Sequence, residues 1–227
     1  MFWACLFALT ACYAFTMWAG IAKTELYIYL MAEDGPLENM ATAFVLAASV
    51  LFALAYVRYK SQRQHLFLVF SLILLFVFFE EISWGQRILG IETPESFKEL
   101  NAQGELNLHN YTPIYKYVNA LVYAGLGLYL IGLPLLVFIE HRIHSFLIKV
   151  KIPIPSPATA FLAFVNYFLF TSFFEKFLAH QGKLGQGEIN YGELLETGLE
   201  LALFYFAFEC LNRGITWLED NEVRFSA

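Results

Sequence analysis

Apolar positions along this 227-residue chain gather into long runs that short polar segments separate. The runs cover residues 2–22, 37–57, 66–89, 114–139, 158–179 and 193–212. A helix needs about 20 residues to cross the roughly 30 Å hydrocarbon core of a bilayer, and each run has about that length. The runs are continuously apolar, whereas membrane strands alternate with a period of two. The pattern therefore predicts an all-α, polytopic transmembrane helix bundle of about six spans.

Composition agrees with this interpretation of the pattern. Hydrophobic residues make up 59% of the chain and charged residues 15%, whereas soluble domains are about 25% charged. No linker or low-complexity tract interrupts residues 1–227, which we interpret as a single transmembrane domain. Cys5, Cys12 and Cys210 lie in apolar runs without metal-ligand spacing, so we interpret them as small core residues. The expected partner is the lipid bilayer, and nothing indicates nucleic acid.

Charged residues predict how the bundle is oriented. Basic residues gather in the second and fourth loops and after the last run, at Arg58, Lys60, Arg63, Arg142, Lys149, Lys151, Arg213 and Arg224. By the positive-inside rule these segments and both termini are cytoplasmic. The segment 90–113 is then an outer-face segment, in which PESFKELNAQ can form one or two amphipathic turns at the interface. Fifteen of the 20 acidic residues fall in the outer half.

The motif FFEEISWGQR, at residues 78–87, places carboxylates at the end of an apolar run. If the helix continued through it, Glu80, Trp84 and Arg87 would share one face. The preceding apolar run is too short to cross the membrane alone, so the span is complete only if Glu80 and Glu81 lie within the bilayer. Acidic residues inside a membrane are costly and are candidates for function. The alternative is an interfacial helix end with a snorkelling arginine.

Further polar residues fall in the same half of the predicted bundle. Glu175 and His180 end the fifth run, while Glu196 and Glu200 lie one and two turns inside the sixth. Glu193 is explained by helix capping at Asn190, but capping does not explain the two deeper acids. In the outer segment, His109 follows Glu105 by four residues, so a helical turn would pair them.

Three motifs between residues 32 and 112 are distinctive: AEDGPLEN, EEISWGQRILGIETP and NAQGELNLHN. In them the chain resembles a widespread group of uncharacterised bacterial integral membrane proteins. This resemblance implies a bacterial inner-membrane protein and brings no assigned activity. The chain is also weakly similar to the CAAX-type intramembrane glutamate proteases, whose motif is Glu-Glu-x-x-x-Arg. Here five residues separate Glu81 from Arg87, and His180 is the one partner available in place of that family's downstream His motifs.

The candidate residues leave three classes of function open. The first is a membrane-embedded enzyme, such as a metal- or glutamate-dependent hydrolase that acts on a lipid or peptide at the outer face. Its predicted catalytic residues are Glu80, Glu81, Glu175 and His180; its substrate-binding residues are Trp84, Gln86, Arg87, His109 and Asn110; and a divalent metal could be held by Glu80, Glu175, Glu196 and Glu200. The second class is an ion- or proton-coupled transporter or channel component. The third is a non-catalytic accessory subunit that meets a membrane protein partner or a second copy of itself.

Overall fold

The computed structural model is all-helical in the part of the chain that it describes. It describes residues 1–32, 34–62, 64–101, 104–108, 110–112, 115–174, 176–177 and 192–214, with the backbone alone at Arg87, Tyr115 and Lys116. The long helices are α1 (Phe2–Ala22), α3 (Pro36–Tyr59), α4 (Leu66–Glu81), α7 (Tyr115–Gly127), α8 (Leu133–Ile139), α10 (Pro157–Leu169) and α12 (Glu193–Arg213). A π-helical segment, η3 (Leu128–Gly132), joins α7 to α8, and a second, η4 (Phe170–Phe174), extends α10. The short helices are α2 (Thr24–Leu30), η1 (Lys60–Gln62), η2 (Ser83–Gly85), α5 (Gln86–Leu89), α6 (Glu95–Lys98) and α9 (His141–Val150).

Four helical stretches in the described chain are long and apolar enough to cross a membrane. They are Phe2–Ala22, Pro36–Gln62, Tyr117–Ile139 and Pro157–Phe174. Helices α4 and α12 occupy the other two predicted positions, but α4 has only 16 residues and α12 carries four glutamates. Side chains such as Trp3 and Phe138 are 75% and 88% exposed. Large exposed apolar surface of this kind suits contact with hydrocarbon. The all-helical fold is therefore confirmed, and the described chain has four candidate membrane spans where six are predicted.

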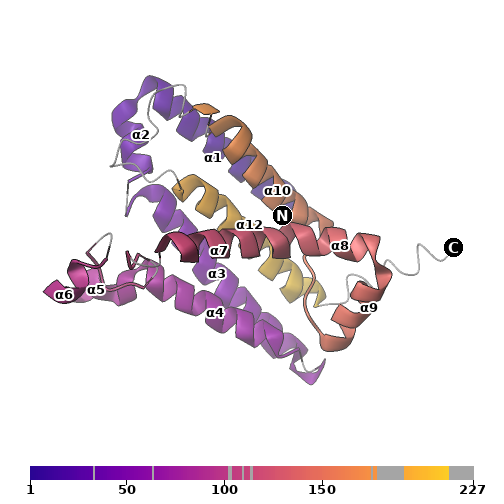
Figure 1. Ribbon diagram of the computed structural model, residues 1–227. Coiled ribbons are helices and arrows are strands. Elements are labelled where there is room, and N and C mark those ends of the chain that lie inside the picture. The colour runs from indigo at the N-terminus through magenta and orange to yellow at the C-terminus, as the bar shows by residue number, and fades with distance from the viewer. Residues whose placement is uncertain are drawn as a thin grey trace.

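Helix α12 lies at the centre of the bundle. It packs most extensively against α3, and also against α10 and α1, while α3 pairs with α4 (Figure 1). Buried residues occur on every side of α12, including Leu194, Leu199, Ala202 and Phe206. A helix that is covered on all sides is a core element of its fold. Its position explains how it can carry acidic residues, because its neighbours shield them from the surrounding lipid.

A buried polar network joins three helices at the middle of this core. Asn166 of α10 is fully buried, and its Nδ2 donates a hydrogen bond to the backbone oxygen of Leu195 at 2.8 Å. The Tyr13 hydroxyl of α1 donates to Asn166 Oδ1 at 2.9 Å. Gly198 lets α10 approach α12 this closely, because a Cβ atom there would lie 1.9 Å from Asn166 Oδ1.

The predicted helix over residues 66–89 is wrong at its end. Helix α4 stops at Glu81, and Ser83 and Trp84 adopt left-handed backbone conformations with φ of +46° and +56°. Such conformations cannot continue a right-handed helix. Glu80, Trp84 and Arg87 therefore do not share one helical face. The chain turns at η2 and starts the new helix α5 (Figure 1).

The two basic segments lie together at one end of the bundle. Lys151 Nζ donates a hydrogen bond to the backbone oxygen of Gln62, which links the segment after α9 to the turn after α3. Helix α2, the segment 82–112 and the start of α12 lie at the opposite end (Figure 1). We call this opposite end the loop end. The structure thus groups the basic loops as the charge pattern predicts, while their cytoplasmic location stays a prediction.

Candidate functional site

Glu80 links helix α4 to the loop-end segment through hydrogen bonds with Trp84 and Leu108. Its side chain is buried, with 4% exposed. Oε1 accepts a hydrogen bond from Trp84 Nε1 at 2.6 Å, and Oε2 accepts one from the backbone amide of Leu108, also at 2.6 Å. The Trp84 ring stacks on Phe79, with centroids 5.6 Å apart. Glu80 and Trp84 do meet, but across a tight turn, and both oxygens of Glu80 hold the loop in place.

Gln86 and Asn101 connect the two halves of the same segment. Gln86 donates from Nε2 to Thr93 Oγ1 at 2.5 Å, and its Oε1 accepts from the amide of Leu106 at 2.8 Å. Asn101 Nδ2 donates to both the backbone and side-chain oxygens of Asn107, each at 2.9 Å. These contacts join the described residues between 82 and 112 into one hydrogen-bonded unit, which we call the cap. Helix α6 within it is one turn long, where the sequence predicts one or two amphipathic turns.

Two of the three distinctive motifs of the sequence contact each other in this cap. Asn107 Nδ2 donates to Ser83 Oγ at 3.0 Å, and the Ser83 hydroxyl donates to Glu105. EEISWGQR and NAQGELNLHN therefore form one hydrogen-bonded unit. Buried polar groups of this kind need partners, so the unit accounts structurally for Glu80, Trp84 and Gln86.

A separate group of carboxylates gathers around Glu200 of α12. Electrostatic interactions connect Glu200 with Glu81 at the end of α4, with Glu38 at the start of α3, and with Glu193 and Glu196 on α12 itself. We call these five residues the carboxylate cluster. The Glu200 residue is partly exposed, but its Oε2 atom is shielded from solvent and has no hydrogen-bond partner among the described residues. The Tyr123 hydroxyl of α7 donates a hydrogen bond to Glu196.

The structure divides the predicted site residues into three sets. Glu81, Glu196 and Glu200 lie together in the carboxylate cluster, whereas Glu80, Trp84 and Gln86 belong to the cap, where Asn110 is also found, half-buried. Glu175, His180 and His109 lie outside the described residues, as does the side chain of Arg87. No three carboxylate, histidine or cysteine side chains in the described part of the chain could hold one metal ion. The metal set Glu80, Glu175, Glu196 and Glu200 thus stays a prediction that depends on Glu175.

Three residues of the site are not predicted from the sequence. Glu38 and Glu193 occupy the first turns of α3 and α12, where capping explains an acid fully. Tyr123 is one of 13 tyrosines and has no special spacing. Only the three-dimensional arrangement of α3, α7 and α12 reveals that these residues meet.

The carboxylate cluster has a clear electrostatic consequence. Every charged neighbour with which Glu200 interacts in the described structure is another carboxylate. Like charges disfavour one another's ionisation where solvent is excluded, so the cluster favours a state in which part of its carboxyl groups carry a proton. A protonated carboxyl group beside an ionised one supplies both an acid and a base.

Comparison with known proteins finds no match that would assign a role to these residues. No family model matches the sequence, and searches of curated proteins and of solved structures likewise find no similar chain.

Proposed function

We propose that this chain is an integral membrane enzyme, a glutamate-dependent hydrolase whose active site is the carboxylate cluster at the loop end. The observation that carries the proposal is Glu200, whose Oε2 atom is shielded and without a described hydrogen-bond partner among other carboxylates. Such a carboxylate is free to accept a proton from water. The membrane setting and the single-ended placement of the site favour a lipid or peptide substrate that approaches from the bilayer surface.

The proposed reaction divides general base and general acid between two carboxyl groups. Glu200 removes a proton from a water molecule as the oxygen attacks an ester or amide carbonyl. Glu81, in its protonated form, returns a proton to the leaving group as the carbonyl bond breaks. Tyr123 orients Glu196 through its hydrogen bond. Both steps together consume one water and leave the proton on Glu200 instead of Glu81, and transfer of this proton from Glu200 back to Glu81 restores the starting state for another cycle.

The position of Glu209 disfavours a proton relay along α12. Glu209 is a buried acid nearer the other end of this helix, and it accepts a hydrogen bond from Thr159 at 2.7 Å. It follows Glu200 by nine residues, which corresponds to about 13 Å along the axis and to opposite faces of the helix at 100° per residue. The two acids therefore do not form a continuous row, as a relay would need.

The proposed enzyme also has an orientation in the membrane. By the positive-inside rule, the basic segments at the α9 end favour a cytoplasmic location for that end. The carboxylate cluster then lies in the half of the bundle nearer the periplasmic side of a bacterial inner membrane.

Oxygen-isotope labelling tests the proposed hydrolase. The full chain is reconstituted in vesicles of phosphatidylethanolamine and phosphatidylglycerol, with a mixed peptide library in parallel, in water enriched in ¹⁸O. Mass spectrometry should detect ¹⁸O in a newly formed carboxylic acid. Glu200→Gln should abolish this incorporation, while Glu95→Gln should leave it unchanged, because the Glu95 side chain is 85% exposed in the cap. Absence of any labelled product with the native chain, or full activity of Glu200→Gln, would refute the proposal.

A further inference from the structure

Helix α9 lies between two candidate membrane spans, at the end of the bundle opposite the carboxylate cluster. The span Tyr117–Ile139 ends just before it, and the span Pro157–Phe174 begins after it. At Glu140, with φ of −125° and ψ of 98°, the helix is interrupted, and α9 turns away from α8 there (Figure 1). A chain that leaves the hydrocarbon near Ile139 forms α9 at the level of the lipid headgroups.

The side chains of α9 point to two opposite sides. His144 and Leu147 are buried against the bundle, with 4% and 7% exposed. Arg142, Phe146 and Lys149 are exposed and lie within about 60° of one another on the other side, at 100° per residue. We call these three residues the outer face of α9. Because the buried pair fixes the rotation of the helix, the outer face points away from the protein.

Contacts at both ends of α9 hold it beside the basic turn after α3. The Glu140 carboxylate accepts a hydrogen bond from the Arg142 amide at 3.0 Å, which caps the start of the helix. Just after its end, Lys151 Nζ donates a hydrogen bond to the backbone oxygen of Gln62. The exposed Lys60 belongs to the same turn. Positive charge from two loops is therefore brought together along α9.

The outer face combines positive charge with exposed apolar surface. Neither Arg142 nor Lys149 has a salt-bridge partner among the described residues, so their charges are available to a ligand. Phe146 between them is 59% exposed, and Ile139 and Val150 on either side along the chain are 79% and 41% exposed. When such a helix lies at a membrane surface, basic side chains reach the phosphate layer and apolar side chains enter the acyl chains. The outer face thus fits a molecule that carries a negative charge next to hydrocarbon.

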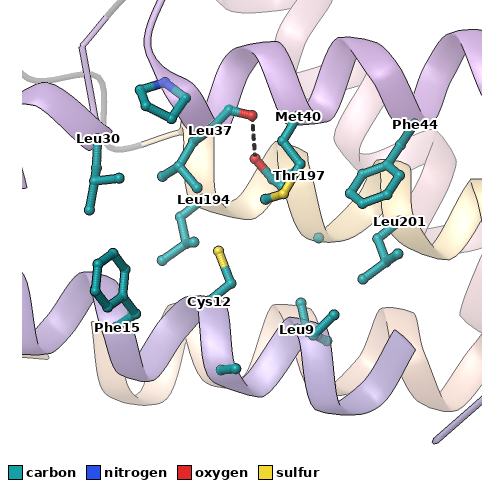
Figure 2. Close-up of a pocket in the computed structure, with 14 residues that line it drawn as sticks. Leu9, Cys12, Phe15, Leu30, Leu37, Met40, Phe44, Leu194, Thr197 and Leu201 are labelled. Atoms are coloured by element: carbon teal, nitrogen blue, oxygen red, sulfur yellow. Dashed lines mark hydrogen bonds between the residues drawn. The ribbon is translucent and has the colours of Figure 1, made fainter. Parts of the chain in front are cut away.

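Charge distinguishes this surface from the apolar groove between α1 and α3, which has α12 as its floor (Figure 2). The groove is lined by residues such as Leu9, Leu37 and Leu201, and none of the described residues that line it is charged. Such a surface does not discriminate between apolar occupants. On α9, by contrast, the cations select negatively charged partners, and the adjoining spans place the helix among phospholipids.

We propose that the outer face of α9 is a binding site for anionic phospholipid. Arg142 and Lys149, about 10 Å apart along the helix axis, contact phosphates of the headgroup layer, and Phe146 contacts the upper carbons of the acyl chains. Attraction to anionic lipid then holds this end of the bundle at the membrane surface. The site lies at the other end of the bundle from Glu200, so it does not depend on the proposed hydrolase.

Quenching by labelled lipid tests this site locally. In the full chain with its three cysteines replaced by serine, Ser145→Cys on α9 carries a fluorophore. Nanodiscs contain equal amounts of phosphatidylglycerol and phosphatidylcholine, and one of the two lipids carries a nitroxide quencher near the ester end of an acyl chain. Each basic side chain favours anionic lipid by roughly fivefold, so labelled phosphatidylglycerol should quench about threefold or more as strongly as labelled phosphatidylcholine. Salt at about 1 M, where the Debye length is about 3 Å, should reduce this ratio.

Charge-matched variants separate the outer face from the net charge of the chain. Arg142→Gln together with Lys149→Gln should lower the quenching ratio to about 1.5 or less. Lys23→Gln together with Lys98→Gln removes the same charge from exposed positions at the loop end and should leave the ratio unchanged, because salt screens so distant a charge. Arg142→Lys together with Lys149→Arg should keep the native ratio, because both charges remain.

Three results would overturn the proposal. The first is equal quenching by the two labelled lipids in the native chain, and the second is a ratio that falls equally in both glutamine double variants. The third is the absence of quenching by either lipid, which would leave the outer face to water or to an acidic segment of a protein.

Discussion

Gly198→Ala tests the packing that holds the core of this bundle together. The added Cβ atom would lie 1.9 Å from Asn166 Oδ1 and 2.3 Å from Asn166 Cγ. Contacts this short cannot persist, so either α10 moves away from α12 or the Asn166 side chain leaves its position. Either change breaks the hydrogen bonds that Asn166 makes with Tyr13 and Leu195.

Three terms set the expected loss of stability. Overpacking a close-packed core costs about 1–3 kcal/mol. Two interhelical hydrogen bonds within a membrane contribute about 0.6 kcal/mol each. Alanine gains about 1 kcal/mol over glycine in helix propensity. The free energy of unfolding should therefore fall by about 1–3 kcal/mol.

Unfolding in mixed detergent micelles, followed by far-ultraviolet circular dichroism, measures this change. Gly125→Ala on α7 is the matched control, because a Cβ atom there meets nothing within 4 Å. It should be neutral or stabilising by up to about 1 kcal/mol. In an Asn166→Ala background Gly198→Ala should lose most of its cost, because the clashing amide is gone. Equal stability of Gly198→Ala and Gly125→Ala would show that the close approach of α10 to α12 is wrong.

Two further predictions concern the cap and the orientation of the bundle. Glu80→Ala removes the acceptor of the hydrogen bonds from Trp84 Nε1 and from the Leu108 amide. Because a hydrogen bond to a charged group contributes about 1.5–3 kcal/mol, hydrogen exchange at the Leu108 amide should accelerate by about 100-fold. The control Glu95→Ala, at an exposed position of the cap, should leave this exchange rate unaltered. In a chain whose three cysteines are replaced by serine, Glu95→Cys should react with an impermeant maleimide from outside intact cells and Ser145→Cys should not; the reverse labelling pattern would invert the proposed topology.

The helical architecture follows from the sequence because hydrocarbon constrains it strongly. The six apolar runs predict α1, α3, α4, α7 to α8, α10 and α12 close to their observed positions. The run at 66–89 is the clear exception. Trp84 is compatible with a helix by composition, and only the hydrogen bonds of the cap show why the backbone turns there. Contacts between residues far apart in the sequence do not change the local pattern of apolar and polar positions, so that pattern does not predict them.

The candidate site is predicted in part, for a related reason. Glu81, Glu196 and Glu200 stand out because acids within apolar runs are costly. Glu38 and Glu193 do not, because they sit where helices begin and local capping explains them. Spacing along one helix shows which residues share a face, but not which helices become neighbours. The pairing of Tyr123 with Glu196 depends on such a neighbour relation.

The adjacent glutamates at the end of α4 show how one short motif can serve both structure and chemistry. Neighbouring residues on a helix point about 100° apart. Glu80 turns toward the cap, where both of its oxygens accept hydrogen bonds, and Glu81 interacts with Glu200 in the carboxylate cluster. This division coincides with the early end of α4: the chain turns at Ser83 and Trp84, and the amide of Leu108 donates a hydrogen bond to Glu80. A membrane acid with both oxygens bonded has little capacity left to move protons, so the chemistry proposed for this end falls to Glu81 and Glu200.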